Sequence, residues 1–266
     1  MSVIVKRIHQ QIFSRENSFQ NLVMGMTGTG KSLSGITFAT AINPKNFTVK
    51  RNVILDPKSF LKFINSEPEP GTPIIGDEIG KWFSARDWYS FQNKVMSIVL
   101  ETNRFMRIAA FWTVPNMRMV DVTLRDLCHA TTETLGINYK MQRCIAKFKY
   151  RQVNPMTGKG YDKFPRIKNK KGETITIDRI RIQRPPTELE NQYLEKKERM
   201  LKNYYVEIEK FLEKGMKIVK KKTKNKQLLI VKDLEKGMSP SDIAKKRNTS
   251  SSYVREIRIK MSARDL

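Results

Sequence analysis

The stretch NLVMGMTGTGKSLSG constrains the fold of this chain more than any other part of it. Gly25, Gly28 and Gly30 lie close together in a chain with only 13 glycines, and Lys31 and Ser32 follow directly. They match the pattern G-x-x-x-x-G-K-[ST], in which backbone N–H groups surround phosphates, the lysine reaches the terminal phosphates and the hydroxyl ligates Mg²⁺. The apolar run before the loop and the apolar residues at helical spacing after it predict a strand, a glycine loop and a helix.

This loop predicts a site for ATP with Mg²⁺. The alternative is a glycine-rich turn with an incidental lysine, and the strand and helix predicted around the loop argue against it. The candidate nucleotide-binding residues are Gly25, Thr27, Gly28, Thr29, Gly30, Lys31, Ser32 and Leu33.

A second motif, TPIIGDEIG, supplies the acidic partner that such a loop needs. Its apolar pair runs into Asp77 and Glu78, which is typical of a parallel strand that ends in two carboxylates. We expect Ser32 and Asp77 to hold the metal, Asp77 through water, and Glu78 to position or deprotonate the attacking water. The alternative is a surface Asp–Glu pair at a strand end.

Further apolar runs alternate with helical patterns along the first two thirds of the chain. RNVILDPKSFLKFI predicts a strand and a helix that begins near Pro57, and RIAAFWTVP and LCHATTETL predict two more strands. This alternation predicts an α/β fold with a mostly parallel sheet covered on both faces. In ATPases of this build the strand between the two motif strands often ends in a polar sensor, and Thr113 is the residue at that place. Between these runs a helical stripe is predicted at Trp88, Phe91, Val95, Ile98 and Val99.

A transition state of phosphoryl transfer gains from one more positive charge, often an arginine of a neighbouring subunit. Arg104 in ETNRFMR is the first candidate for this arginine finger, and Arg107, Arg118 and Arg125 follow it. A solvated surface arginine is the alternative reading in so basic a chain.

The formal net charge of +25, from 51 Lys and Arg against 26 Asp and Glu, indicates a polyanionic partner. Nucleic acid is favoured over an anionic membrane surface. A basic ribosome-associated protein and the lysine-rich surface of a thermophile's protein are the alternatives. The start of the chain lacks the apolar core of a signal peptide, and no stretch of about 18 apolar residues is present. We therefore expect a cytoplasmic protein without a membrane span, in the host cytoplasm if it is viral. The cysteines and histidines lack the spacing of a zinc site.

Two basic β-hairpins are expected in the middle of the chain. Residues 142–151 alternate as a strand that turns at NPMTGKGYDKFP, and a second hairpin is predicted to turn at Lys171–Gly172. The lysines at these turns either contact the phosphates of a nucleic acid or are solvated tips.

A long helix is expected to open at Pro185–Pro186, followed by a lysine-rich linker at 217–227. Its apolar stripe is expected to pack on the core or on a neighbouring protomer; the stripe consists of Leu189, Tyr193, Met200, Tyr204, Ile208 and Phe211.

The last forty or so residues resemble a helix-turn-helix unit. Ser239 and Pro240 predict the start of one helix, Asn248 lies at the turn, and a second helix starts near Ser250. Ile243, Ala244, Val254 and Ile257 are the expected inner residues, covered by Leu228, Leu229, Val231 and Leu234. The expected DNA-binding residues are Ser251, Ser252, Tyr253, Arg255 and Arg258. A small three-helix oligomerisation or lid module is the alternative.

The order of these motifs resembles the HerA/FtsK superfamily of DNA-pumping ATPases, particularly its small archaeal and viral members. The resemblance covers roughly Ser2 to Pro186 and is carried by Gly25–Ser32, Asp77–Glu78 and the softer run ETNRFMRIAAFWTVPNMRMVDVTLRDLCHATTET. It implies a RecA-like P-loop core, a hexameric ring with nucleotide at subunit boundaries, and movement along double-stranded DNA. The chain differs at the sensor strand, which ends in Trp112–Thr113 where glutamine is common.

The sequence therefore predicts an ATPase domain at 1–186, a long helix with a basic linker at 187–226, and a small all-α helix-turn-helix domain at 227–266. The expected function is ATP-driven translocation of double-stranded DNA, and the resemblance implies viral genome packaging or transfer of a mobile element. Two alternatives stay open. One is a DNA-binding regulator or segregation protein switched by ATP; the other is a morphogenesis ATPase resembling the Zot group of filamentous phages.

Overall fold

The computed structural model describes residues 2–81, 103–169 and 171–262, and only the backbone of residues 2, 81, 103, 104, 207, 214–224 and 262. The predicted stripe from Trp88 to Val99 lies outside the described residues. The chain divides into two compact units, Met1–Arg199 and Met200–Leu266.

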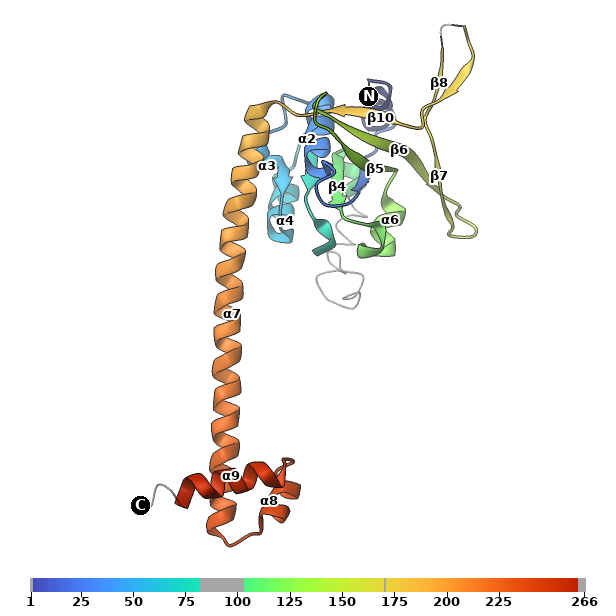
Figure 1. The fold of residues 1–266 in the computed structure, drawn as a ribbon. Helices are drawn as coiled ribbons and strands as arrows, with labels where there is room; N and C mark the ends of the chain where they lie inside the picture. The colour runs from blue at the N-terminus through green and yellow to red at the C-terminus, as the bar shows by residue number, and fades with distance from the viewer. Residues whose placement is uncertain (1, 82–102, 170, 263–266) are drawn as a thin grey trace. The chain divides into compact units, whose positions relative to one another are not determined.

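The first unit is built on an eight-stranded sheet with the order β10-β6-β5-β1-β4-β3-β2, in which β7 also pairs with β6 (Figure 1). The strands are β1 Phe19–Met24, β2 Val53–Ile54, β3 Pro73–Gly76, β4 Ala109–Val114, β5 Ala130–Asn138, β6 Arg143–Val153, β7 Gly160–Lys163 and β10 Ile180–Gln183. Strands β5, β1, β4, β3 and β2 are parallel to one another, and β6 is antiparallel to β5, β7 and β10. The predicted α/β fold with a mostly parallel sheet is confirmed.

Helices cover both faces of this sheet. The Phe38 ring of α2 (Lys31–Ile42) stacks on Phe111 of β4 with ring centroids 5.4 Å apart. On the other face, Phe60 of α4 (Pro57–Asn65) meets the ring edge of Trp112 at 5.5 Å. Because successive residues of a strand point to opposite faces, β4 supplies a large aromatic side chain to each half of the core. Before α7, the other helices among the described residues of this unit are α1 Ser2–His9, η1 Gln10–Ser14, α3 Val49–Asn52, η2 Ile79–Lys81, η3 Asn103–Met106, η4 Met117–Met119 and α6 Val122–Leu127.

Both predicted hairpins form. Strands β6 and β7 are joined by an exposed turn at residues 154–159, and β8 (Arg166–Lys168) pairs with β9 (Thr174–Thr176) in a separate two-stranded sheet. Gly172 has φ +82° at the second turn, a conformation that glycine adopts without steric cost. Lys159 and Lys171 are exposed at these turns.

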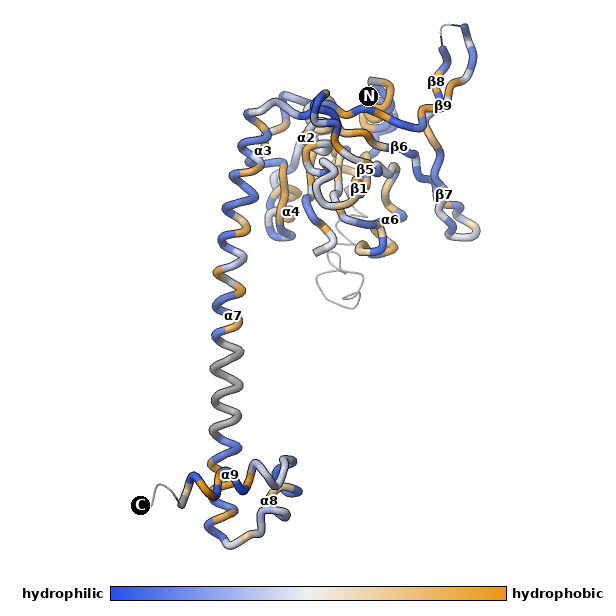
Figure 2. Tube along the Cα trace, viewed as in Figure 1, coloured by the Kyte–Doolittle hydropathy of each residue, from blue (hydrophilic) through white to orange (hydrophobic). Residues whose placement is uncertain are grey.

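Helix α7 runs from Thr187 to Glu235 as one helix of 49 residues. It includes the lysine run 217–227, which the sequence predicted as a linker. The run contains neither glycine nor proline, and lysine is a good helix former, so the backbone continues helically. Figure 2 shows apolar residues scattered among hydrophilic ones along the described part of α7. The predicted stripe is covered only near its start, since Tyr193 is 4% exposed whereas Phe211 is 76% exposed.

The second unit packs the end of α7 against α8 (Pro240–Lys246) and α9 (Ser251–Ser262). Its buried core consists of Ile230, Ile243, Ala244, Val254 and Ile257. The predicted inner residues of α8 and α9 are confirmed, and so are Val231 and Leu234 as partly buried cover.

The prediction for Leu228 and Leu229 is wrong, because they are 52% and 41% exposed while Ile230 is fully buried. Ile230 and Leu234 are four residues apart and share a helix face, from which the two leucines are turned away.

The turn between α8 and α9 forms as the sequence predicts. The Ser239 side chain caps α8 by accepting the Asp242 N–H, and Asn248 has φ +47° at the turn. Within the described residues, no helix is both long and apolar enough to cross a membrane.

Candidate active site

The glycine loop lies between β1, which ends at Met24, and α2, which begins at Lys31. Gly30 precedes α2 with φ +88°, a left-handed conformation. Gly25 has φ +152°, and a Cβ atom there would collide with the Thr134 side chain of β5. Both positions therefore require glycine, as the motif predicts.

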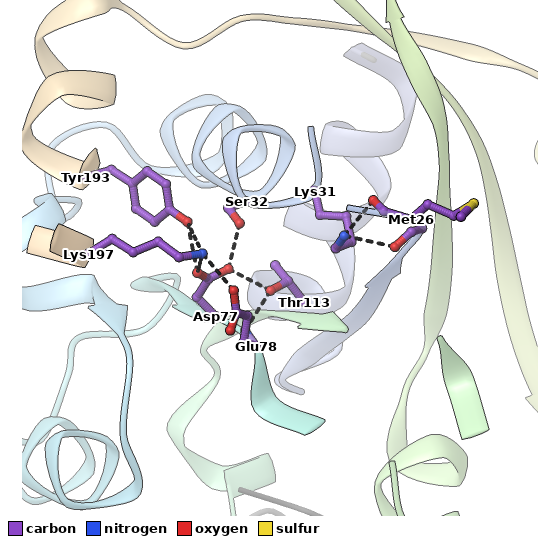
Figure 3. A network of polar contacts seen from close by, with 9 residues as sticks. Met26, Lys31, Ser32, Asp77, Glu78, Thr113, Tyr193 and Lys197 are labelled. Atoms are coloured by element: carbon purple, nitrogen blue, oxygen red, sulfur yellow. Dashed lines mark hydrogen bonds and ion pairs between the residues drawn. The ribbon is translucent and has the colours of Figure 1, made fainter. Parts of the chain in front are cut away.

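The loop is closed by its own polar groups. The Lys31 ammonium donates hydrogen bonds to the carbonyl oxygens of Gly25 and Met26, both at 2.8 Å. The Thr29 hydroxyl donates to the same Met26 oxygen at 2.7 Å. Burial lowers the pKa of Lys31, and the charge of Asp77 opposes this shift. The loop thus holds a partly buried cation on its inner side, close to the first turn of α2 (Figure 3).

The two sequence motifs meet at the carboxyl ends of β1, β4 and β3, which are neighbours in the sheet. Ser32 Oγ donates a hydrogen bond to Asp77 Oδ1 at 2.6 Å, and Thr113 Oγ1 donates to the same oxygen at 2.7 Å. Thr113 Oγ1 in turn accepts the backbone N–H of Glu78 at 2.9 Å. Asp77 is 2% exposed, so this buried network connects the glycine loop, β4 and the acidic pair (Figure 3).

The chain turns sharply after β3. A Cβ atom at Gly76 would collide with the Trp112 ring, and Glu78 has φ +53°, which is uncommon for a residue other than glycine. Strained residues of this kind persist only where the surrounding contacts hold them. The Thr113 contact to the Glu78 N–H is one such contact, and Lys197 supplies another.

Two residues of α7 complete the network, and the sequence did not predict either as a site residue. Tyr193 OH donates to Asp77 Oδ2 at 2.8 Å. The Lys197 ammonium lies 2.9 Å from Asp77 Oδ2 and 2.9 Å from Glu78 Oε1. Both carboxylates are therefore joined to one cation from a segment about 120 residues further along the chain.

The pKa values of these two residues are shifted. Burial and the nearby Asp77 carboxylate raise the pKa of Tyr193 to about 12, so its hydroxyl stays a donor. Burial alone would lower the pKa of Lys197, but Asp77 and Glu78 outweigh it and raise the pKa above its usual range. Lys197 is thus charged at any physiological pH.

Helix α7 is anchored here by further polar contacts. Glu190 pairs with Arg184 through two hydrogen bonds of 2.6 Å, and the Lys196 ammonium donates to backbone oxygens of Val49, Lys50 and Val53. The polar side chains at 190, 193 and 197 recur at three- and four-residue steps, which places them on one helix face. That polar spacing was the signal available in the sequence, although Tyr193 was assigned to an apolar stripe.

The oxygen atoms of Ser32 and Asp77 suit Mg²⁺, a hard cation that proteins bind through one or two carboxylates together with substrate phosphates. No group of three or more His, Cys, Asp or Glu side chains among the described residues forms a complete metal cage. The donor set therefore fits a metal that depends on a phosphate ligand.

The other predicted site residues are less closely involved. Thr27 is exposed on the loop, and Leu33 lines a pocket beside it. The backbone of Arg104 lies in η3 and its side chain lies outside the described residues. Arg107 pairs with Glu16 at 2.7 Å.

The remaining alternative fingers make local backbone contacts. The N–H of Arg118 donates to Asn116 Oδ1 at 2.7 Å, and Arg125 Nε donates to the carbonyl oxygen of Asp121 at 3.4 Å.

The five predicted DNA-binding residues lie within the first eight residues of α9 in the second unit. Ser252, Arg255 and Arg258 are exposed, whereas Ser251 and Tyr253 are half-buried. Tyr253 OH accepts a hydrogen bond from Gln227 Nε2 of α7 at 3.1 Å. The face that carries the arginines is thus open to solvent, and Tyr253 also packs at the edge of the small core.

No protein-family profile and no curated protein sequence matches this chain. Among solved structures, it is similar to the N-terminal domain of zonular occludens toxin from Neisseria meningitidis. That match has 18% sequence identity and a TM-score of 0.36, and it covers 55% of this chain and 93% of that chain. It is also similar to the genome packaging NTPase B204 from Sulfolobus turreted icosahedral virus 2, solved with AMP and with AMPPCP. Those two matches have 8% and 9% identity and a TM-score of 0.36, and each covers 55% of this chain and 96% of that chain.

Proposed function

We propose that this protein binds ATP with Mg²⁺ at the loop between β1 and α2, hydrolyses it, and uses the energy to move double-stranded DNA. The observation that carries the ATPase proposal is the 2.6 Å hydrogen bond between Ser32 Oγ and Asp77 Oδ1. It brings the hydroxyl of a phosphate-binding loop to the carboxylate at the end of a neighbouring strand, which is the pair of ligands that such ATPases use for the metal.

Each residue of the network has a role in this proposal. Backbone N–H groups of the loop and the Lys31 ammonium hold the phosphates. Ser32 and Asp77 hold Mg²⁺, which supplies neutralisation of the charge that develops on the terminal phosphates. Glu78 orients the attacking water and accepts its proton, and Thr113 joins the backbone of Glu78 to Asp77.

Lys197 and Tyr193 act as positioning residues. Both bind Asp77 Oδ2, whereas Oδ1 accepts the hydrogen bonds of Ser32 and Thr113. Lys197 also fixes Glu78 Oε1, so the base and the metal ligand keep a constant separation. A base held by its neighbours loses less conformational freedom when the reaction begins.

The arginine finger is proposed to be Arg104, supplied by the adjacent subunit of a hexameric ring. Neither Arg104→Ala nor Glu78→Gln protein should turn over ATP alone. A mixture of the two should regain activity, because some sites then combine an intact Glu78 with an intact Arg104 of the neighbour. If the mixture stays inactive, the finger does not act between subunits.

The DNA partner is supported by charge. The chain carries a net charge of +25, and exposed lysines stand at the turns of both hairpins. The helix-turn-helix reading of α8 and α9 rests on their cap, turn and exposed arginines. We propose that the hairpins contact DNA phosphates and that α9 enters a groove. Genome packaging or mobile-element transfer is the setting that the superfamily resemblance implies.

Steady-state ATP turnover with and without long double-stranded DNA tests this function. We expect turnover to rise severalfold with DNA of any sequence, and Glu78→Gln to abolish turnover while ATP still binds. Glu209→Gln, at an exposed position of α7, is the matched control and should behave as wild type. Turnover that survives in Glu78→Gln would show that the base is another group. Flat turnover together with tight binding to one short sequence would instead favour an ATP-switched regulator.

A further inference from the structure

A pocket lies beside the glycine loop, on the side away from the acidic pair. It is lined by residues of the loop and α2 and by residues of β5, β6, β10 and their connections: Gly30, Leu33, Ser34, Ile137, Tyr139, Gln142, Arg143, Cys144, Ile182, Gln183 and Arg184. In the sheet, β5, β6 and β10 lie on one side of β1, whereas β4 and β3, which carry Thr113 and Asp77, lie on the other. The loop after β1 therefore separates the pocket from the acids.

This arrangement gives a direction to a triphosphate bound by the loop. The lysine of the motif reaches the β- and γ-phosphates and the backbone N–H groups cradle the α- and β-phosphates. Because Lys31, Asp77 and Glu78 mark the γ end, the α end lies toward Leu33 and Ser34, in the first turn of α2. The group attached to the α-phosphate thus comes out toward the pocket.

The chemistry of the pocket suits a flat, mostly apolar group with a few polar edges. Ile137 packs against Gly30, and its side chain would lie 3.3 Å from a Cβ atom at that position. Tyr139 is 71% exposed, which leaves a face of its aromatic ring available for stacking. The Arg184 guanidinium is fixed at the same place by hydrogen bonds to Glu190 and to Gln142 Oε1.

A buried hydroxyl also lines this pocket. Ser34 is 2% exposed and its Oγ makes no hydrogen bond of normal geometry to a described residue. It lies beside the Cys144 thiol, whose pKa is raised by burial and lowered in part by this hydroxyl. A buried hydroxyl without a well-formed partner is costly, and a polar group of a ligand beyond the α-phosphate would satisfy it.

We propose that this pocket holds the base and ribose of the bound nucleotide, with the Tyr139 ring stacked on the base. The inference rests on the proposed nucleotide site and adds its nucleoside half. It also gives a role to the β5–β6 turn and to β10, which the ATPase motifs do not include.

The test compares two ligands in direct binding measurements on the full chain: AMPPCP with Mg²⁺, and inorganic tripolyphosphate with Mg²⁺, which lacks the nucleoside. Wild type should bind AMPPCP more tightly. Tyr139→Ala should reduce this preference by at least about fivefold, the lower range of aromatic–base stacking, and leave tripolyphosphate binding unchanged. Tyr139→Phe should keep the preference, and so should Tyr205→Ala, which removes a similarly exposed tyrosine of α7.

The outcomes separate this inference from the proposed function. If Lys31→Ala leaves the binding of both ligands unchanged, the phosphate site itself is refuted. If Lys31→Ala abolishes binding but wild type binds both ligands equally, the pocket does not hold the nucleoside. Equal losses for both ligands in Tyr139→Ala would also overturn the inference, since the residue would then act on the loop and not on the base.

Discussion

Replacing Lys197 by methionine removes the cation between Asp77 and Glu78 and keeps most of the aliphatic side chain. The two ion pairs are 2.9 Å long, and the side chains of Lys197, Asp77 and Glu78 are 24%, 1% and 39% exposed. Breaking a fully buried charge pair costs about 3–5 kcal/mol. Solvent reaches Lys197 and Glu78, so we expect a smaller loss, about 2 kcal/mol in the free energy of unfolding of the first unit.

For a unit of this size, each 1 kcal/mol lowers the thermal midpoint by about 2–4 °C, so Lys197→Met should lower it by about 4–8 °C. Loss of the contact to Glu78 should also lower kcat by about tenfold or more, the equivalent of about 1.4 kcal/mol in the activation barrier. The KM for ATP should change little, because Lys31 and the loop backbone still hold the phosphates.

The assays are thermal unfolding and ATP turnover of Lys197→Met, Lys197→Arg and Lys210→Met. Lys197→Arg keeps a charge and should regain part of the kcat, whereas Lys210→Met alters an exposed lysine of the same helix and should match wild type. A normal kcat in Lys197→Met would refute the positioning role. So would an equal loss in Lys197→Arg and Lys197→Met, because charge would then be irrelevant.

Three further results are expected. Gly25→Ala should lower the free energy of unfolding by at least about 2 kcal/mol and abolish ATP binding, because its Cβ collides with Thr134 at φ +152°. In chemical denaturation, Gly28→Ala should lose less stability, since a Cβ there meets nothing within 4 Å. Equal losses in the two variants would contradict the steric reason. Burial lowers the pKa of His129 from 6.5 to about 4, so on acidification the unfolded state takes up the proton first. The free energy of unfolding should therefore fall by roughly 2 kcal/mol between about pH 7 and about pH 5. Denaturant titrations of His129→Gln should not show this loss. Hydrogen bonds from Arg247 and Lys246 lower the pKa of Asp233 from 3.8 to about 2, so the carboxylate stabilises the fold above about pH 4 and loses this effect as the pH falls through about 2. Asp233→Asn should lower the thermal midpoint and remove this acid dependence. An acid transition that is unchanged in the variant would exclude a stabilising role for Asp233.

The sequence predicts those parts of the fold in which the local residue pattern matches the burial of the same residues in the structure. The glycine loop, its flanking strand and helix, and the strand that ends at Asp77 each have a distinctive residue pattern. The hairpins are marked by glycine turns, and the caps and turn of α8 and α9 by Ser239, Pro240 and Asn248. These signals act over a few residues, so one sequence is enough to read them.

The contribution of α7 to the site depends on tertiary packing, and its local signal is weak, a polar spacing at residues 190, 193 and 197. Tyr193 and Lys197 are ordinary residues of a charged helix until the sheet brings Asp77 beside them. The burial of Leu228 and Leu229 could not be predicted from the sequence for the same reason. The rotation of α7 against α8 and α9 decides which residue is buried, and the buried residue is Ile230.

The pocket proposed for the nucleoside combines residues from the loop, β5, β6 and β10. It was not visible in the sequence, because the antiparallel pairing of β6 with β5 and β10 creates it.

The effect of Mg²⁺ on ATP affinity in wild type and in Asp77→Asn tests the central claim most directly. If the loop encloses the triphosphate and Asp77 holds its metal, Mg²⁺ should tighten ATP binding to wild type by about tenfold or more. Asp77→Asn should bind ATP with little response to Mg²⁺, since outer partners of a metal change affinity by about 10–100-fold. A wild type that does not bind ATP, or an Asp77→Asn protein with the full response to Mg²⁺, would contradict the account.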